Sequence, residues 1–405
     1  MAERSVPVGP FTPGLNNRLR PTELDTTLSD RTRVRYLYGA DNVDLTPQGG
    51  IKRREGFTQA LAGDMHSLWS ADDASYVVAN DELCSINAGV TGTTVLRSGM
   101  PKLPVSYTKS PNGIVYWSNG LELRCIVDGV DCPISAAPAL APTVTVGSGA
   151  LPAGLYIVAF TWTGPQGESA PTHAVQVEVP ESGSINVTNA AGATVWLSGP
   201  NGDHLSSYGA VSTVAVLGQG GRNMRMTDTA PMPPGHIVRM HQGSLVVAHD
   251  NVLFFSVPYR EGVYQPARGY IPFASKITAV ESVVNGIFIC ADHTYWVGTF
   301  FDTAGLQDKL PFGAILGSSV YSPEENKAYW QSPFGLIAGD ASGNVSKLQD
   351  SSLTFAPASF GATMYRFRDG RTSVVTTRSG VQTNRAAALA WADADVIRKE
   401  TSDEL

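Results

Sequence analysis

Seven short stretches of this chain have the pattern of a β-hairpin, in which two apolar runs flank a turn rich in Asn, Asp, Gly or His. They recur about every 40 residues, the length of a four-stranded propeller blade, except for one step of about 131 residues. The apolar runs are continuous rather than alternating, which indicates strands covered on both faces. The repeat therefore predicts an all-β protein, a β-propeller of about six or seven blades. The hairpins begin near Leu37, Val77, Val115, Val246, Ile287, Ala328 and Val374.

The long step, between Val115 and Val246, indicates a second domain inserted into the propeller. In residues 141–230 the apolar and polar residues alternate more cleanly, and turn signals recur about every ten residues, as in a small antiparallel β-sandwich. The stretch from Gly154 to Ser169 resembles an immunoglobulin or fibronectin type III module, whose subtype stays open without a pair of cysteines. The predicted domains are an extended N-terminal arm at 1–35, a first propeller segment at 36–140, the inserted sandwich at 141–230, a second propeller segment at 231–380, and a C-terminal tail at 381–405. Residues 386–398 of that tail fit either a short helix or a frayed end.

Composition agrees with several packed β units in a chain that is neither secreted nor membrane-spanning. The 405 residues are 42% hydrophobic, and 41 Gly with 26 Pro supply many turns. We expect no secretory signal and no membrane span, hence folding in a reducing compartment. We predict that Cys84, Cys125 and Cys290 are small buried strand residues, and that Cys132 lies in a loop. The spacing of Cys125 and Cys132 matches no zinc site.

The residues able to carry chemistry do not form a catalytic pattern in the sequence. His249 and His293 fall in hairpin turns, at the place that Asn80 and Asn119 occupy in earlier repeats, so turn chemistry explains them. His236 and His241 have no acidic or cysteine partner at ligand spacing. Acidic pairs lie beside turns, which suits solvated loop residues. Four aromatic pairs at comparable places in the repeats fit blade packing better than a ligand cage. We therefore predict no catalytic residue, cofactor or metal site.

The N-terminal segment carries the most specific pattern. Gly14-Leu15-Asn16-Asn17 is followed about 25 residues later by Asp41-Asn42-Val43-Asp44-Leu45, a Gly turn and residues 51–57, Ile-Lys-Arg-Arg-Glu-Gly-Phe. This segment resembles the opening of the tail nozzle or tail hub (tail tubular) proteins of short-tailed bacteriophages. The resemblance implies a propeller that in some members carries an inserted sandwich. It also implies a family-like assembly motif made of Asn16, Asn17, Asn42, Asp44, Arg53, Arg54, Gly56 and Phe57.

The same resemblance implies a structural role in the virion tail, after synthesis in the host bacterial cytoplasm. Six copies would form a ring below the phage adaptor or head-to-tail proteins, carry tail fibres or spikes, and let double-stranded DNA pass through the channel. A net charge of −7 argues against a dedicated nucleic-acid-binding domain and suits a conduit that does not grip the genome. Two alternatives stay open, namely an adhesin that binds a host surface receptor and a propeller hydrolase or lyase that acts on polysaccharide.

Overall fold

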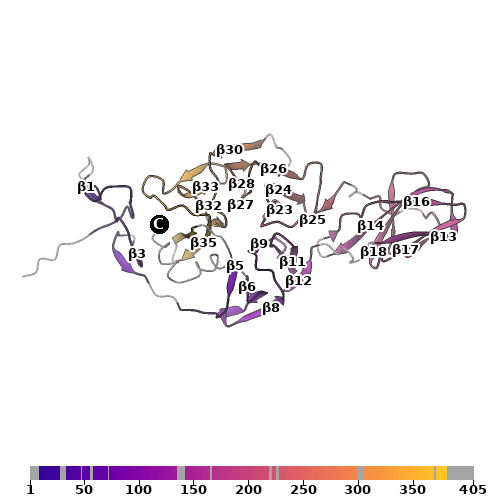
Figure 1. Ribbon diagram of the computed structural model, residues 1–405, viewed down its shortest axis with the longest axis horizontal. Coiled ribbons are helices and arrows are strands. Elements are labelled where there is room, and N and C mark those ends of the chain that lie inside the picture. The colour runs from indigo at the N-terminus through magenta and orange to yellow at the C-terminus, as the bar shows by residue number, and fades with distance from the viewer. Residues whose placement is uncertain are drawn as a thin grey trace, which may run out of the picture. The chain divides into compact units, whose positions relative to one another are not determined.

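The computed structural model describes most of the chain, and we discuss only those residues. They are 9–27, 33–46, 48–54, 58–71, 73–134, 142–164, 167–218, 221–224, 228–298, 305–368 and 371–380. The chain divides into two compact units, one of residues 1–102 with 273–405 and one of residues 103–272. Within the described residues the secondary structure is β-strand except for one short 3-10 segment, Ala88–Val90 (Figure 1).

The first unit contains three four-stranded antiparallel sheets whose strands are joined in chain order. They are β5 to β8 (Met65–Ala71, Ala74–Ala79, Glu82–Ile86, Thr93–Arg97), β27 to β30 (Ala279–Val283, Gly286–Cys290, Thr294–Val297, Leu306–Leu310) and β31 to β34 (Ser319–Ser322, Lys327–Ser332, Gly335–Gly339, Val345–Lys347). A two-stranded sheet follows, made of β35 (Phe360–Arg368) and β36 (Arg371–Ser379). The first strands of three successive sheets, β27, β31 and β35, lie beside one another.

Turn residues explain why the hairpins form where the sequence predicts them. Between β6 and β7, Asn80 and Asp81 both have positive φ, 51° and 64°. A two-residue turn of this kind matches the twist of its strands and favours Asn, Asp and Gly. The Asn80 backbone NH also donates to the Asp64 carbonyl at 2.9 Å, which ties the turn to the start of the same sheet.

Aromatic residues fill the space between the last two complete sheets of the first unit. Phe288, Trp296 and Trp330 are at most 4% exposed, and the ring centre of Phe288 lies 4.6 Å from that of Trp296 and 5.2 Å from that of Trp330. A Cβ on Gly339 would lie 2.4 Å from the Phe288 ring, so only a glycine at position 339 leaves room for this ring. Trp296 and Trp330, each from one of the predicted aromatic pairs, thus serve blade packing.

The second unit contains two more blade sheets. One is β9 to β12 (Ser106–Lys109, Val115–Ser118, Leu123–Val127, Val130–Pro133). The other has the order β22, β23, β24 and β26 (Ile237–His241, Ser244–His249, Val252–Val257, Tyr270–Pro272), with β25 (Arg260–Tyr264) and β21 (Ala230–Pro231) attached to β24. The two sheets share a core that includes Tyr116, Cys125, Val238 and Val247, each 0% exposed.

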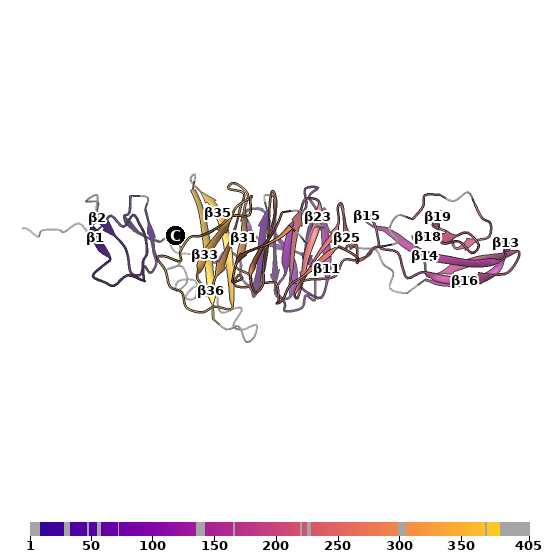
Figure 2. The same ribbon diagram turned by 90° about the horizontal axis from the view of Figure 1, so that it is seen from above.

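The inserted segment forms two antiparallel sheets over a separate core (Figure 2). One sheet is β13, β17 and β20 (Thr143–Leu151, Gly183–Thr188, Thr213–Val214), and the other joins β15, β14, β18 and β19 (Gly167–Glu168, Gly154–Gly164, Ala193–Ser198, Leu205–Gly209) with β16 (Val175–Val179). Both sheets contribute to the core, for example through Ile185 and Phe160. The segment is therefore a β-sandwich; that it belongs to the immunoglobulin or fibronectin type III class stays a prediction.

The two junctions of the insert meet at one place in the second unit. The Ile134 carbonyl oxygen, after β12, lies 3.3 Å from where a Cβ on Gly262 would stand. At the other junction, after β21, the Met232 backbone NH donates to the Gly262 carbonyl at 2.9 Å. Gly235 follows, and its carbonyl accepts a hydrogen bond of 2.6 Å from the Ser118 hydroxyl. Both ends of the insert are thus fixed to the same blade pair.

The sheets described above are the blades of a β-propeller, and the predicted all-β propeller fold is confirmed. Five of the seven predicted hairpins are pairs of central blade strands. Among the described residues no helix is long and apolar enough to cross a membrane. Residues 386–398, predicted as either a short helix or a frayed end, lie outside the described residues.

Three details differ from the prediction. The first hairpin forms between β3 (Val43–Leu45) and β4 (Ile51–Arg53), but it is an exposed two-stranded sheet and not a buried blade pair. The run 374–377 pairs with the preceding strand β35, a partner that the hairpin pattern did not predict. Cys132 is not in a loop; it lies in β12, directly opposite Cys125 of β11.

Candidate functional site

The candidate site is the N-terminal segment that the sequence singled out, here called the arm module, residues 9–54. Its two short sheets are β1 (Asp25–Thr27) with β2 (Arg33–Arg35), and β3 with β4. The turn of the second hairpin packs on the start of the module, since the Phe11 backbone NH donates to the Gly49 carbonyl at 2.7 Å. A Cβ on Gly49, whose φ is 73°, would lie 2.7 Å from the same nitrogen. This position therefore requires glycine.

Asn16 organises the chain locally. It is 6% exposed, and its side-chain oxygen accepts hydrogen bonds of 3.1 Å from the backbone NH groups of Arg18 and Leu19. Its own backbone NH donates to the Leu37 carbonyl at 2.7 Å, beside the parallel bridge between Leu15 and Leu37. Asn is favoured in such turns because its side chain satisfies nearby backbone NH groups.

Asn17 and Arg18 fasten the arm module to the segment before β35. The Asn17 amide donates to the Thr354 carbonyl at 2.9 Å, and its oxygen accepts from the Thr354 backbone NH at 2.7 Å. The Asn17 backbone NH donates to Ser352 at 3.1 Å, and the Arg18 guanidinium donates to the Leu353 carbonyl at 3.0 Å. The Asn17 side chain thus makes the donor and acceptor contacts with Thr354 that a neighbouring strand would make, although the two residues are 337 positions apart in the sequence.

Replacing Asn17 by alanine is expected to loosen this contact by about 1–2 kcal/mol, because the backbone NH and carbonyl of Thr354 lose their partner. The amide of Thr354 should then exchange its hydrogen about tenfold faster, as measured by hydrogen exchange of the full chain. Asn17→Asp keeps the acceptor and removes the donor, so it should show a smaller effect. Equal exchange rates in the wild type and in Asn17→Ala would contradict the observed contact.

Three of the predicted motif residues hold the β3–β4 hairpin together. Asn42 has a φ of 55°, a conformation that Asn adopts more readily than most residues, and its carbonyl accepts from the Arg54 backbone NH at 3.0 Å. The Arg54 guanidinium pairs with Asp44 at 2.9 Å. Arg53 lies opposite Val43 and is exposed. Gly56 and Phe57 lie outside the described residues. An assembly role for these residues stays a prediction.

The outer surface of the hairpin combines basic and apolar groups. All three residues of β4 are exposed, and they are Ile51, Lys52 and Arg53. Ile51 is 50% exposed, and Tyr38, just before β3, is 59% exposed. A two-stranded hairpin is only marginally stable in water, and its outer edges carry backbone groups available for pairing. This surface is suited to contact with another protein chain.

One of the two histidines predicted in turns lies in a strand instead. His293 lies in a blade turn, as predicted, and its Nδ1 atom is 2.6 Å from Asp308. His249 is the last residue of β23, opposite Val252, and Asp250, with a φ of 50°, begins the turn. The Nδ1 atom of His249 is 2.7 Å from the Pro234 carbonyl. His241, at the end of β22, is 3% exposed, and burial lowers its pKa to about 4. Within the described part of the chain, no three His, Cys, Asp or Glu residues are grouped so as to hold a metal ion.

The stability of the second unit is expected to fall by about 2 kcal/mol as the pH drops from 6.5 to 4, because of His241. Its folded-state pKa lies below the value of 6.5 for an exposed histidine, so its contribution is complete above pH 6.5 and is lost as the pH falls. Urea unfolding of the wild type and of His241→Gln at pH 7 and pH 4.5 measures the difference. Identical changes in both proteins would contradict this prediction.

A buried carboxyl has the opposite dependence on pH. Glu261 of β25 is 7% exposed; burial raises its pKa, and Tyr116 is its hydrogen-bond partner. Burial also raises the pKa of Tyr116. Because the folded state favours the protonated carboxyl, the Glu261 contribution is present at low pH and is lost as the pH rises through the folded-state pKa. His241→Gln leaves this contribution in place, so the comparison above isolates the histidine.

Two polar networks escaped the sequence analysis. In the β9–β12 blade the Asp131 carboxylate accepts from the Trp117 indole NH at 2.9 Å and from the Arg124 guanidinium at 2.8 Å. In the sandwich, Glu168 accepts from the Thr161 hydroxyl at 2.6 Å and pairs with Arg222 at 2.9 Å. Sequence gives little sign of either network, because each joins residues on different strands or loops. Stabilisation of the fold is sufficient to explain both networks.

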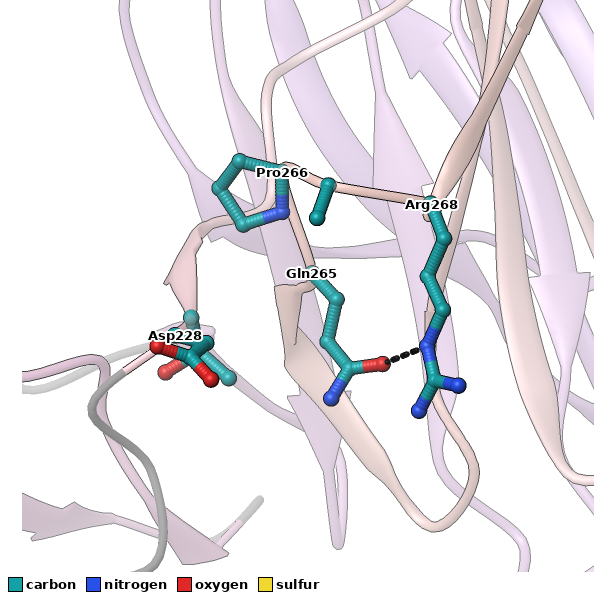
Figure 3. A pocket seen from close by; sticks show the side chains of 6 residues that line it. Asp228, Gln265, Pro266 and Arg268 are labelled. Carbon is teal, nitrogen blue, oxygen red and sulfur yellow. Dashed lines mark hydrogen bonds between the residues drawn. The ribbon is translucent and has the colours of Figure 1, made fainter.

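A shallow hollow of about 410 Å³ lies in the second unit, with Asp228, Gln265, Pro266 and Arg268 among the residues that line it (Figure 3). Gln265 and Arg268 are joined by a hydrogen bond of 2.6 Å, and Asp228 lies apart from that pair. The charged groups of the hollow are the Asp228 carboxylate and the Arg268 guanidinium, and a guanidinium stays protonated in proteins, so it cannot act as a base. The hollow provides weaker grounds for a function than the arm module does.

Comparison with known proteins assigns no family. The sequence matches no protein-family model and no curated protein. Solved structures that are similar include BBS1N in complex with ARL6DN (11% identity, 79% of this chain and 93% of that chain, TM-score 0.33). Virginiamycin B lyase from Staphylococcus aureus is similar at 11% identity over 79% of this chain and 93% of that chain, with a TM-score of 0.31. YCF48 from Cyanidioschyzon merolae is similar at 11% identity over 78% of this chain and 93% of that chain, with a TM-score of 0.32. Similarity this low assigns no activity or partner to the chain.

Proposed function

We propose that this chain is a structural protein of a short bacteriophage tail, in which copies form a ring that conducts the genome. The observation that carries the proposal is the arm module. The segment with the family resemblance is fastened to the propeller through Asn17 and Arg18, and it presents an exposed two-stranded hairpin. A hairpin held in this way is a preformed contact for a neighbouring copy.

The rest of the fold supports a mechanical role. Propeller blades protect all but short strand edges, so a ring of propellers would be stiff and resistant to unwanted pairing. Passing DNA should not be held, since each neutralised phosphate adds salt-dependent affinity, and the chain is acidic overall at −7. The proposal involves no catalytic step. Its further partners are the adaptor proteins and the fibres or spikes of the tail.

The inserted sandwich favours a second candidate function, that of an adhesin. It has its own core, in which Tyr156, Val158, Ile185 and Val195 are 0% exposed, so its surface is free to vary without loss of the fold. Deleting 142–229 would separate the two functions. Loss of binding to host cells with ring formation unchanged would favour adhesion, whereas loss of rings would place assembly contacts in the insert.

The main test is the oligomeric state of the purified full chain, measured by electron microscopy and mass photometry. We expect rings with a fixed number of copies, six by the resemblance. Arg53→Glu should reduce ring formation without changing the melting temperature, because Arg53 is exposed. Lys276→Glu, also an exposed basic residue but outside the arm module, is the matched control. A chain that stays monomeric up to its solubility limit and is absent from purified virions would overturn the proposal.

A further inference from the structure

Two cysteines face each other across the outer hairpin of one blade. Cys125 of β11 and Cys132 of β12 are register partners, and their Sγ atoms are 3.2 Å apart. Cys125 is fully buried, and Cys132 is partly exposed. Both are free thiols in this structure. Among the described strands, β12 pairs with β11 alone and so lies at the edge of this sheet.

The backbone geometry suits a covalent bond between these thiols. Directly opposed residues of an antiparallel pair have Cα atoms about 4.5–5.5 Å apart, within the range that a disulfide spans. The two Sγ atoms would have to approach by about 1.2 Å to reach bonding distance. The turn that joins the strands has positive φ at Asp128 and Gly129, 50° and 76°, which keeps the strands close and in register.

We propose that Cys125 and Cys132 form a reversible disulfide in the presence of a disulfide oxidant such as oxidised glutathione. The more exposed Cys132 thiolate attacks one sulfur of the oxidant, forms a mixed disulfide and releases one glutathione. The Cys125 thiolate then attacks the Cys132 sulfur and releases the second glutathione. Two protein thiols are oxidised to one disulfide and one glutathione disulfide is reduced to two thiols. The two protons that the protein thiols lose are taken up by the two released glutathione thiolates.

The remaining two cysteines provide an internal contrast. Cys84 is 2% exposed and Cys290 is 1% exposed. Burial raises the pKa of both thiols, to about 12 for Cys290, so neither can begin the exchange with an oxidant as the partly exposed Cys132 can. Neither faces another cysteine across its sheet; their register partners on the neighbouring strands include Val77, Val95, Ala279 and Thr294. Oxidation should therefore be confined to the opposed pair.

The disulfide would have a structural consequence at the insert. It would join the last two strands of the blade just before Ile134, where the chain leaves for the sandwich. It would also lie in the core that this blade shares with the next one, since Cys125 and Ile134 belong to that core and Cys132 packs against it. A bond there would fix the edge strand that carries the insert. The inference does not depend on the proposed function, because it needs only a change from a reducing to an oxidising medium.

The test uses the purified full chain, incubated with oxidised glutathione or with dithiothreitol, alkylated and cut by a protease that cleaves before aspartate. Cleavage before Asp128 and Asp131 separates the two cysteines, so their peptides remain joined only by a disulfide. We expect joined peptides after oxidation, separate alkylated peptides after reduction, and unlinked thiols at Cys84 and Cys290. Separate peptides after oxidation, or a lasting glutathione adduct on Cys132, would overturn the proposal.

A second measurement guards against an indirect effect. The melting temperature of the second unit should rise by about 5 °C in the oxidised wild type relative to the reduced one. Cys132→Ser, which keeps a small polar side chain at the partly exposed position, should fold and should melt at the same temperature in both media. An equal shift in Cys132→Ser would show that the oxidant acts elsewhere and would overturn the proposal.

Discussion

Replacing Trp330 by alanine is expected to lower the free energy of unfolding of the first unit by about 4 kcal/mol. The change loses the favourable transfer free energy of a buried indole and leaves a cavity in its place. Trp330 is 1% exposed and contacts Phe288 at a ring separation of 5.2 Å. The wall opposite cannot collapse easily, because Phe288 is already in close contact with the backbone of Gly339. Urea unfolding followed by circular dichroism measures the effect.

Phe334→Ala is the matched control for Trp330. Phe334 also makes an aromatic contact, with Phe312 at 4.9 Å, but it is 51% exposed. We expect its removal to cost about 1 kcal/mol. If Trp330→Ala and Phe334→Ala lowered stability equally, the cluster between these two blades would not be the core described above.

Replacing Asp131 by alanine is expected to destabilise the second unit by about 3 kcal/mol. The Asp131 side chain is 4% exposed and accepts from both Trp117 and Arg124, which is paired with it at 2.7 Å. Removing it leaves an indole NH in the interior and a largely buried guanidinium without its counter-charge. Chemical unfolding measured at pH 7 gives the loss.

The matched variants separate the two partners of Asp131. Asp131→Asn retains an acceptor for the Trp117 indole but loses the charge, so it should cost less than Asp131→Ala. Asp203→Ala removes an aspartate whose side chain is 89% exposed and should change stability by less than about 0.5 kcal/mol. A loss of that small size in Asp131→Ala would contradict the network.

The blades were predictable because their signals are local. Each central hairpin combines continuous apolar runs with a turn such as Asn80-Asp81, and both features lie within a dozen residues. Strand β35, which pairs with the run at 374–377, was not predicted for the same reason. It carries exposed Met364 and Phe367 among polar residues, so it lacks the apolar run that marks the central blade strands.

The contacts of the candidate site could not be predicted, although its residues could be singled out. Asn17 binds the backbone of Thr354, and a backbone partner leaves no trace in side-chain pattern. The sequence predicts a loop at Cys132, which follows Asp131, and β12 is only four residues long. Only pairing with β11 shows that the two thiols are opposed. Long-range register decides both features, and a single sequence does not contain it.

The convergence of both insert junctions on Gly262 has a consequence for how such a chain can change over time. Because Ile134 and Met232 lie against the same residue, the blades need only a short bridge between them, whatever lies in that bridge. Inserted modules of different length can therefore replace one another between these two junctions without moving a blade of the second unit. Related chains that share the propeller are expected to differ most in the segment between these two junctions.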